Sequence, residues 1–201
     1  MLEAVSVAMH AVSLSRIEPD DAALVLGAGM IGLLILQALR AAGCAKVWVM
    51  DVDASRLKLA TELGATAVLE TSGRELSSKI SDLTGGKGVD LAMEAIGINE
   101  TVAAAIDCVR KGGGVTLVGN IAPEVTLPLQ KVVTKQIRLQ GSCASAGEYP
   151  QAIDLVASRR IRVKPLITAV APLEDGPRWF ERLYSREPNL LKVVLTPEGP
   201  G

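Results

Sequence analysis

The chain has 201 residues, enough to bury the core of one large domain or of one domain with an appendage. Hydrophobic residues make up 49% of it and aromatic residues only 2%, so a core of Val, Leu, Ile and Ala is expected, and the 19 glycines suit a parallel sheet covered by helices. The 21 basic and 22 acidic residues give a net charge of −1 without a Lys/Arg run, which argues against nucleic acid as a partner.

Strand-like and helix-like apolar runs alternate along most of the chain. Strands are expected at 24–26, 47–51, 67–69, 91–94, 115–118 and 137–141. Helices are expected at 30–42, 56–63, 76–83, 100–109, 129–134 and 149–158, with Asn99 as a cap for the fourth. A further helix at 177–184 and an apolar strand at 190–197 follow as an appendage. The alternation predicts an α/β fold with a doubly wound, six-stranded parallel sheet, the Rossmann architecture.

The clearest functional motif is the G-x-G-x-x-G turn formed by Gly27, Gly29 and Gly32, between the first strand and the first helix. If a pyrophosphate lies there, Gly27 permits the tight turn and Gly29 lets the backbone approach the phosphates. Gly32 lets the helix pack closely on the strand. The start of the helix then offers unpaired N–H groups and the positive end of its dipole. The motif therefore predicts binding of a dinucleotide.

Asp51 strengthens this prediction because it ends the second strand, about 20 residues after the last glycine, where dinucleotide-binding domains carry an acid. A carboxylate there can accept both hydroxyls of the adenosine ribose, and it would repel a 2′-phosphate, so NAD is favoured over NADP. Asp53 is interpreted as a turn or cap residue. The glycines at 84–88 do not form a P-loop, because Ser81 replaces its first glycine and Gly88 its Ser/Thr.

At this point the chain resembles the zinc-type medium-chain alcohol and polyol dehydrogenases, in the branch of sorbitol, threonine and sugar-alcohol-phosphate dehydrogenases. The resemblance covers essentially the whole chain and is carried by the stretches VLGAGMIGLL, DVDASRLKLATELGA, MEAIG, LVGN, GSCA and VKPLIT. Met30 stands where the family usually has proline, and Arg56 would lie against the adenine. The cofactor-binding residues that the resemblance implies are Gly27, Gly29, Met30, Ile31, Gly32, Asp51, Arg56, Ala95, Ile96, Gly97, Val118, Gly119, Asn120, Ser142 and Cys143.

The resemblance also implies a division of the chain. The stretch LEAVSVAMHA within residues 1–20 is similar to the helix that enters the cofactor domain from the catalytic domain, with Ala4 in place of the usual proline. Residues 21–172 would form the dinucleotide-binding domain, and residues 173–201 would return to the catalytic domain. That GroES-like catalytic domain is expected to be absent from this chain. Glu3 would approach the catalytic zinc in a full-length parent.

A zinc site within this chain alone is not expected. His10 is the single histidine, and Cys44, Cys108 and Cys143 are widely spaced, without a C-x-x-C pair. His10 is expected to make an ordinary polar contact and the first two cysteines to pack in the core. Cys143 would line the nicotinamide end, with no neighbouring base to activate it. No catalytic residue is therefore assigned.

The sequence thus predicts the NAD(H)-binding part of an oxidoreductase that transfers a hydride between NAD and a polyol or secondary alcohol, inactive without its catalytic half. A small alcohol substrate would bind only with the missing domain. The resemblance also implies a homodimer through the cofactor domains, with the edge strands near 137–141 and the following strand pairing across a two-fold axis. The alternative from another class is a stand-alone NAD(H)-binding regulatory or sensor module. A methyltransferase-like domain is disfavoured by the third glycine. Reduced thiols and the lack of a signal or a bilayer-spanning stretch predict a cytoplasmic protein without a membrane partner.

Overall fold

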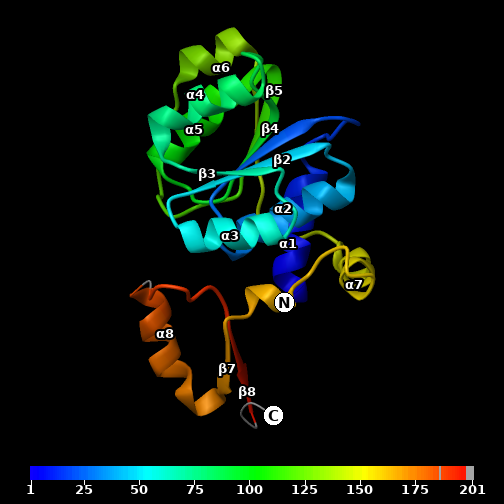
Figure 1. Ribbon diagram of the computed structural model, residues 1–201, viewed down its shortest axis with the longest axis vertical. Coiled ribbons are helices and arrows are strands. Elements are labelled where there is room, and N and C mark those ends of the chain that lie inside the picture. Colours follow the sequence, from blue (N-terminus) through cyan, green and yellow to red (C-terminus); the bar gives the residue numbers. More distant parts are fainter. Residues whose placement is uncertain (186, 198–201) are drawn as a thin grey trace. The chain divides into compact units, whose positions relative to one another are not determined.

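The computed structural model describes residues 1–185 and 187–197. The chain divides into two compact units, Met1–Ile161 and Arg162–Gly201 (Figure 1). This division comes earlier than the expected one after residue 172. The helix expected as a separate connector, α1 (Leu2–Ser13), belongs to the first unit, where it packs on α2 (Met30–Ala42).

The first unit is built on a six-stranded sheet of order β3-β2-β1-β4-β5-β6, in which every pairing is parallel. The order reverses between β1 and β4, and in such sheets ligands bind in the crevice at the carboxyl ends of the strands beside that switch point. The predicted fold class is confirmed. The strands are β1 (Ala22–Leu26), β2 (Lys46–Asp51), β3 (Ala67–Glu70), β4 (Val89–Glu94), β5 (Val109–Leu117) and β6 (Arg138–Gly141).

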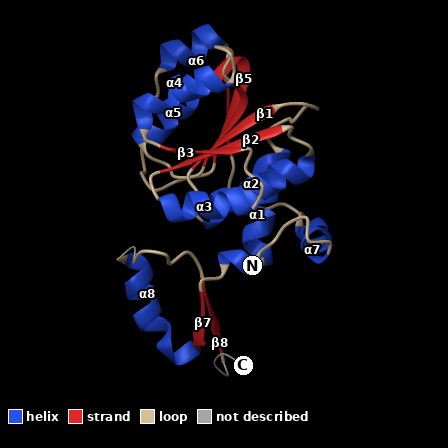
Figure 2. Cartoon of the chain, viewed as in Figure 1, coloured by secondary structure: helices blue, strands red, loops and turns tan. Residues whose placement is uncertain are grey.

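Helices cover both faces of this sheet. Figure 2 shows α4, α5 and α6 on one side of the sheet and α1, α2 and α3 on the other. The central strands are therefore buried on both faces, which explains why they read as continuous apolar runs rather than as alternating ones. The remaining helices of this unit are α3 (Ala54–Glu62), α4 (Gly73–Leu83), α5 (Asn99–Cys108), α6 (Leu129–Lys135) and α7 (Tyr149–Ala157).

Glycines set both ends of α2. Gly29 precedes the first helical residue, and Gly43 follows the last with a φ of 102°, the left-handed conformation that commonly ends helices. The start of α5 differs from the prediction, because Ile98 rather than Asn99 is its N-cap. The Asn99 side chain instead accepts a hydrogen bond from Thr126 N–H at 2.6 Å, which ties the start of α5 to the loop after β5.

The second unit holds a two-stranded parallel sheet of β7 (Ala169–Pro172) and β8 (Val193–Thr196) with α8 (Gly176–Tyr184) between them in sequence. The sequence analysis did not predict β7, and β8 is shorter than the strand expected at 190–197. Trp179 of α8 stacks on the guanidinium of Arg182, 3.9 Å from the ring centre. In the part of the chain that the structure describes, no helix has the length and apolar character needed to cross a bilayer.

Candidate functional site

The glycine turn joins β1 to α2 at the carboxyl edge of the sheet. Gly27 has a φ of +100°, and a Cβ there would lie 2.7 Å from Ile96 Cγ1. A Cβ on Gly32 would lie 1.8 Å from the Gly27 carbonyl oxygen, so α2 packs directly against the turn. A Cβ on Gly29, in contrast, would have none of the described neighbouring atoms within 4 Å. The turn is thus closed on its inner side and open where a ligand would approach.

The first turn of α2 faces this open side without a capping side chain. Gly29 is the N-cap residue, and α2 has no acidic residue in its first turn. No described side chain therefore caps its leading N–H groups, and the helix dipole adds positive potential at the same place. Met30 and Ile31 follow Gly29 and are half-buried. This end of α2 has the properties of an anion-binding site, as the sequence predicts.

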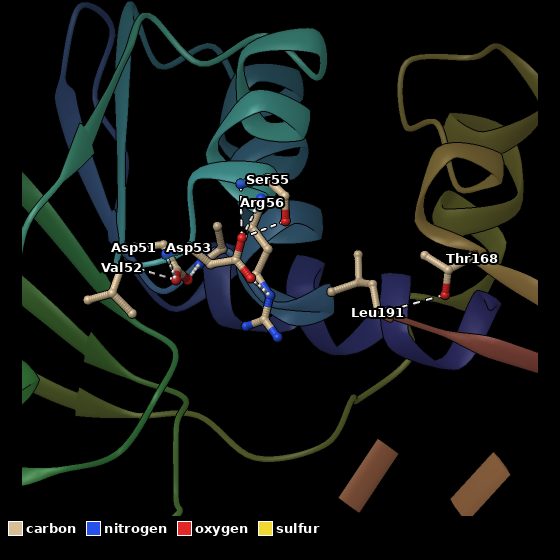
Figure 3. A network of polar contacts seen from close by, with 8 residues as sticks. Asp51, Val52, Asp53, Ser55, Arg56, Thr168 and Leu191 are labelled. Atoms are coloured by element: carbon tan, nitrogen blue, oxygen red, sulfur yellow. Dashed lines mark hydrogen bonds and ion pairs between the residues drawn. The ribbon is translucent and has the colours of Figure 1, made fainter. Parts of the chain in front are cut away.

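Asp51 lies beside the turn and contacts it through its side chain. Figure 3 shows this side chain next to Val52 and Asp53. Its Oδ2 accepts a hydrogen bond from Ala28 N–H at 2.6 Å, and Oδ1 accepts from Val52 N–H and Asp53 N–H at 2.8 and 3.0 Å. The residue is only 7% exposed. Because a carboxylate offers about four acceptor sites, it retains capacity for a further donor such as a ribose hydroxyl.

Asp53 starts α3 and positions Arg56. Its side chain accepts hydrogen bonds from Ser55 N–H at 2.9 Å and Arg56 N–H at 3.3 Å, which makes it the N-cap. The Ser55 hydroxyl also donates to this carboxylate, and that bond is the main cause that holds the pKa of Asp53 below its ordinary value. Arg56 Nε lies 3.4 Å from Asp53 Oδ2 (Figure 3). The interpretation of Asp53 as a cap residue is confirmed.

The loops after β4 and β5 meet backbone to backbone. A Cβ on Gly97, whose φ is +85°, would lie 2.3 Å from Gly119 C, and one on Gly119 would lie 2.2 Å from Ile96 C. Ala122 N–H donates to the Gly97 carbonyl at 2.8 Å. The structure thus brings together two predicted segments, Ala95–Gly97 and Val118–Asn120, and the contact between Ile96 and Gly27 places them against the glycine turn.

Glu94 stabilises the contact between these two loops through hydrogen bonds. It is fully buried, and its carboxylate accepts hydrogen bonds from Gly97 N–H at 2.9 Å and from the Thr101 hydroxyl at 2.7 Å. Its backbone carbonyl accepts from Gly119 N–H at 3.0 Å. The sequence analysis did not identify Thr101 as a site residue, because only the fold shows that the first turn of α5 contacts Glu94 at the end of β4.

Ser142 and Cys143 follow β6 at the same edge of the sheet. Ser142 N–H donates to the Leu117 carbonyl at 2.9 Å, which holds it next to the end of β5 and hence to Val118. Its hydroxyl oxygen is buried and has no hydrogen-bond partner among the described residues. A buried hydroxyl without a partner is uncommon in folded proteins, and the polar group of a ligand would satisfy it. Cys143 is a free, exposed thiol.

A hollow of about 530 Å³ opens beyond the carboxyl ends of β2 and β3. The side chain of Val52, 71% exposed, provides its apolar part directly after Asp51. Its size falls within the range of small-molecule pockets, about 300–1,000 Å³. The sequence analysis did not predict this hollow. Its described lining residues are Val52, Glu70, Thr71, Ser72, Glu75 and Glu100.

The residues considered for metal binding do not come together. Among the described residues no three His, Cys, Asp or Glu side chains form a cluster that could hold a metal ion. His10 Nδ1 lies 2.7 Å from Glu148 Oε1, an ordinary polar contact as expected, and Glu3 is exposed on α1. Burial raises the pKa of the Cys44 thiol to about 11 and that of Cys108 to about 12, as suits packing residues.

The comparisons with known proteins agree with this geometry. A family model described as zinc-binding dehydrogenase matches residues 31–158. Sorbitol dehydrogenase of Ovis aries is 35% identical over 198 residues, which cover 97% of this chain and 55% of that protein. The structure of 2R,3R-butanediol dehydrogenase from Bacillus subtilis superposes with a TM-score of 0.88 at 27% identity, over 98% of this chain and 56% of that one.

A third similar protein has a bound cofactor. It is described as a zinc-binding dehydrogenase from Sinorhizobium meliloti and was solved bound to NADP, and it superposes with a TM-score of 0.85 at 27% identity, over 98% of this chain and 58% of its own. The chain therefore spans little more than half the length of these relatives. The family model matches more than half of the chain. From sequence and fold together, this chain belongs to the zinc-binding dehydrogenase family and corresponds to the cofactor-binding part of its alcohol and polyol dehydrogenases.

Proposed function

We propose that this chain binds NAD(H) at the carboxyl edge of its sheet, as the cofactor-binding part of an oxidoreductase that transfers a hydride between NAD and a polyol or secondary alcohol. The observation that carries the proposal is the 2.6 Å hydrogen bond from Ala28 N–H to Asp51 Oδ2. It places the acid that would hold a ribose immediately beside the turn that would hold a diphosphate.

Each part of the cofactor has a matching part of the site. The diphosphate would lie over Gly29, where a Cβ would meet no neighbour, and against the uncapped start of α2. The adenosine ribose would donate one hydroxyl to Asp51, which already accepts three backbone hydrogen bonds. The adenine would enter the hollow beside Val52, with Arg56 against it as the family resemblance implies. The nicotinamide end would lie by Val118 and Ser142, whose hydroxyl has no partner among the described side chains.

In the proposed reaction the bound cofactor supplies the hydride chemistry, and this chain binds and orients it. Oxidation of an alcohol also needs a group that polarises the alcohol and removes its proton. The described residues contain no cluster of three His, Cys, Asp or Glu side chains that could hold a metal ion. We therefore place zinc, substrate binding and proton transfer in the part of a full-length protein that lies outside the matched region, with Glu3 approaching that zinc.

The same proposal includes the assembly and location of the protein. β6 is the last strand of the sheet, and Arg138, Gln140 and Gly141 are exposed on it. An open edge of this kind can pair with the same edge of a second copy about a two-fold axis, so we propose a homodimer through the cofactor-binding units.

The three free cysteines suit a reducing compartment, which supports a cytoplasmic location.

A titration with NADH tests the proposed function. Trp48, buried in β2 three positions before Asp51, is expected to change its emission as NADH binds, and calorimetry gives the affinity independently. Replacement of Asp51 by Ala should weaken binding by about 1–3 kcal/mol, because a charge-assisted hydrogen bond to the ribose is lost. The chain alone should not oxidise polyols. Absence of NADH binding by the wild-type chain would refute the proposal, and turnover of polyols by this chain alone would refute its division of labour.

A further inference from the structure

The hollow that would receive the adenine has an unusual charge. Of its described lining residues three are carboxylates, Glu70, Glu75 and Glu100, and none is basic. They come from three elements that are separate in sequence: the end of β3, the first turn of α4 and the first turn of α5. A hollow for a neutral base does not by itself require three negative charges. The arrangement therefore bears on which adenosine group can enter.

Glu70 lies next to the acid that would hold the ribose. In the parallel pairing of β2 with β3, Asp51 and Glu70 are register partners. Neighbouring strands run about 4.8 Å apart, and partners in register project to the same face of a sheet. Thr71 N–H continues the pairing with a 3.3 Å hydrogen bond to the Asp51 carbonyl. The last residue of each strand is thus a carboxylate, and that of β3 lines the hollow.

Glu75 and Glu100 line the hollow from two helices. Thr71 Oγ donates to Glu75 Oε2 at 3.2 Å, which directs this carboxylate back toward the end of β3. The Glu100 side chain packs against the first residue of α4, because a Cβ on Gly73 would lie 2.5 Å from Glu100 Oε1. The carboxylates of α4 and α5 are thereby held near each other and near the hollow.

Basic partners neutralise little of this charge. Lys79 Nζ lies 3.7 Å from Glu75 Oε2, in a pair in which both side chains are well exposed and which therefore contributes little. Arg56 is paired with Asp53. Among the side chains that the structure describes, none forms an ion pair with Glu70 or Glu100. Among the side chains that the structure describes around the hollow, negative charge therefore exceeds positive charge.

We propose that Glu70, Glu75 and Glu100 form a second charge filter, in addition to Asp51, that excludes a 2′-phosphate and makes the site selective for NAD(H). The inference rests on the proposed function and deepens it. A phosphate monoester carries about −1.5 to −2 charges at pH 7. Because Glu70, Glu75 and Glu100 are exposed, each repels it only weakly, and the filter depends on all three acting together. A 2′-hydroxyl and a neutral adenine do not meet this repulsion. Replacement of Asp51 alone is therefore not sufficient to admit NADPH.

Calorimetric titrations with NADH and NADPH test this filter on three forms of the chain. The first is the wild type, and the second combines Glu70→Gln, Glu75→Gln and Glu100→Gln. The third is a matched control that removes three exposed acids at the opposite, amino edge of the sheet, by Glu18→Gln, Asp20→Asn and Asp82→Asn. Both triple variants change the net charge equally, so a difference between them reports position rather than total charge. Thermal unfolding of each form checks that it is folded.

The glutamine variant should raise the ratio of NADPH affinity to NADH affinity at least about tenfold above the wild-type ratio, because three nearby repulsive charges are removed. The control variant should keep the wild-type ratio of the two affinities. In the wild type, preference for NADH should shrink as salt is raised from about 0.05 to 0.5 M, since screening weakens the repulsion. Asp51→Asn alone should still prefer NADH.

An unchanged NADPH-to-NADH affinity ratio in the glutamine variant would overturn the filter, as would full NADPH binding by Asp51→Asn alone. In both cases NADH binding by the wild type would leave the proposed function intact. Failure of the wild type to bind either cofactor would refute the proposed function itself, and the two failures are therefore distinguishable. If the triple variant does not fold, the pair Glu70→Gln and Glu75→Gln is measured against Glu18→Gln and Asp82→Asn with the same criterion.

Discussion

Two glycines of the turn have opposite structural roles, although the motif treats them alike. Gly32 has no room for a side chain, because its Cβ would meet the Gly27 carbonyl oxygen at 1.8 Å. Gly29 has a φ of −68° and a ψ of 179°, which any residue adopts, and a Cβ there would meet nothing. Gly32 is therefore required by the packing of the protein, whereas a side chain at position 29 would fit the protein and would interfere only with the proposed cofactor.

This difference gives a test at the residue scale. Gly29→Ala should leave the free energy of unfolding within about 0.5 kcal/mol of the wild type but weaken NADH binding at least about tenfold, because the new methyl group lies where the diphosphate approaches. Gly32→Ala should lower the free energy of unfolding by more than about 2 kcal/mol, through overpacking. Urea unfolding and calorimetry measure both quantities. Tight NADH binding by Gly29→Ala would contradict the assigned position of the diphosphate.

At the scale of elements, the start of α3 depends on one capping side chain. Asp53→Ala should cost about 1 kcal/mol of stability near pH 7, within the range of N-cap replacements. The pKa of Asp53 is lower in the folded chain than its ordinary value, so its contribution is complete above the ordinary carboxyl pKa and is lost as the pH falls through the lower, folded value. Urea unfolding of both proteins across this pH range should show the difference shrinking toward acid. A difference that stays constant with pH would exclude the charged cap as its cause.

Local signals determined how well each element could be predicted. The bounds of α2 were predicted without error, because glycines at 29 and 43 mark both ends. β5 begins at Val109, well before the predicted residue 115, because the glycines at 112–114 suggest a turn although the strand continues through them beside an irregularity in its pairing with β4. β7 was missed because its four residues are defined by pairing with β8, about 24 positions later, which no local pattern indicates.

The parts of the candidate site also differ in how far the sequence could predict them. The proposed phosphate and ribose parts lie within one strand-helix-strand unit, from Gly27 to Asp51, so their spacing in sequence was sufficient to propose them. The structure brings the turn and Asp51 into contact. The segments around Gly97 and Gly119 were named only through the family resemblance. The acidic hollow could not be predicted, because Glu70, Glu75 and Glu100 meet through the order β3-β2-β1-β4 of the sheet rather than through their spacing.

For the whole molecule, the open edge of β6 predicts its assembly. Sedimentation at micromolar concentration should show a dimer. Gln140→Asp on the exposed edge should shift it toward monomer, because a two-fold axis brings like charges together there. Gln151→Asp, the same substitution at an exposed position on α7, is the matched control and should leave the dimer unchanged. A wild-type monomer at these concentrations would contradict the proposed dimer but not the cofactor site.

A crystal structure of the chain with bound NADH tests the central claim most directly. The diphosphate should lie over Gly29 at the start of α2, with the adenosine ribose hydrogen-bonded to Asp51 and the adenine in the hollow beside Val52. Cofactor density in any other place, or a ribose out of hydrogen-bonding reach of Asp51, would contradict the account.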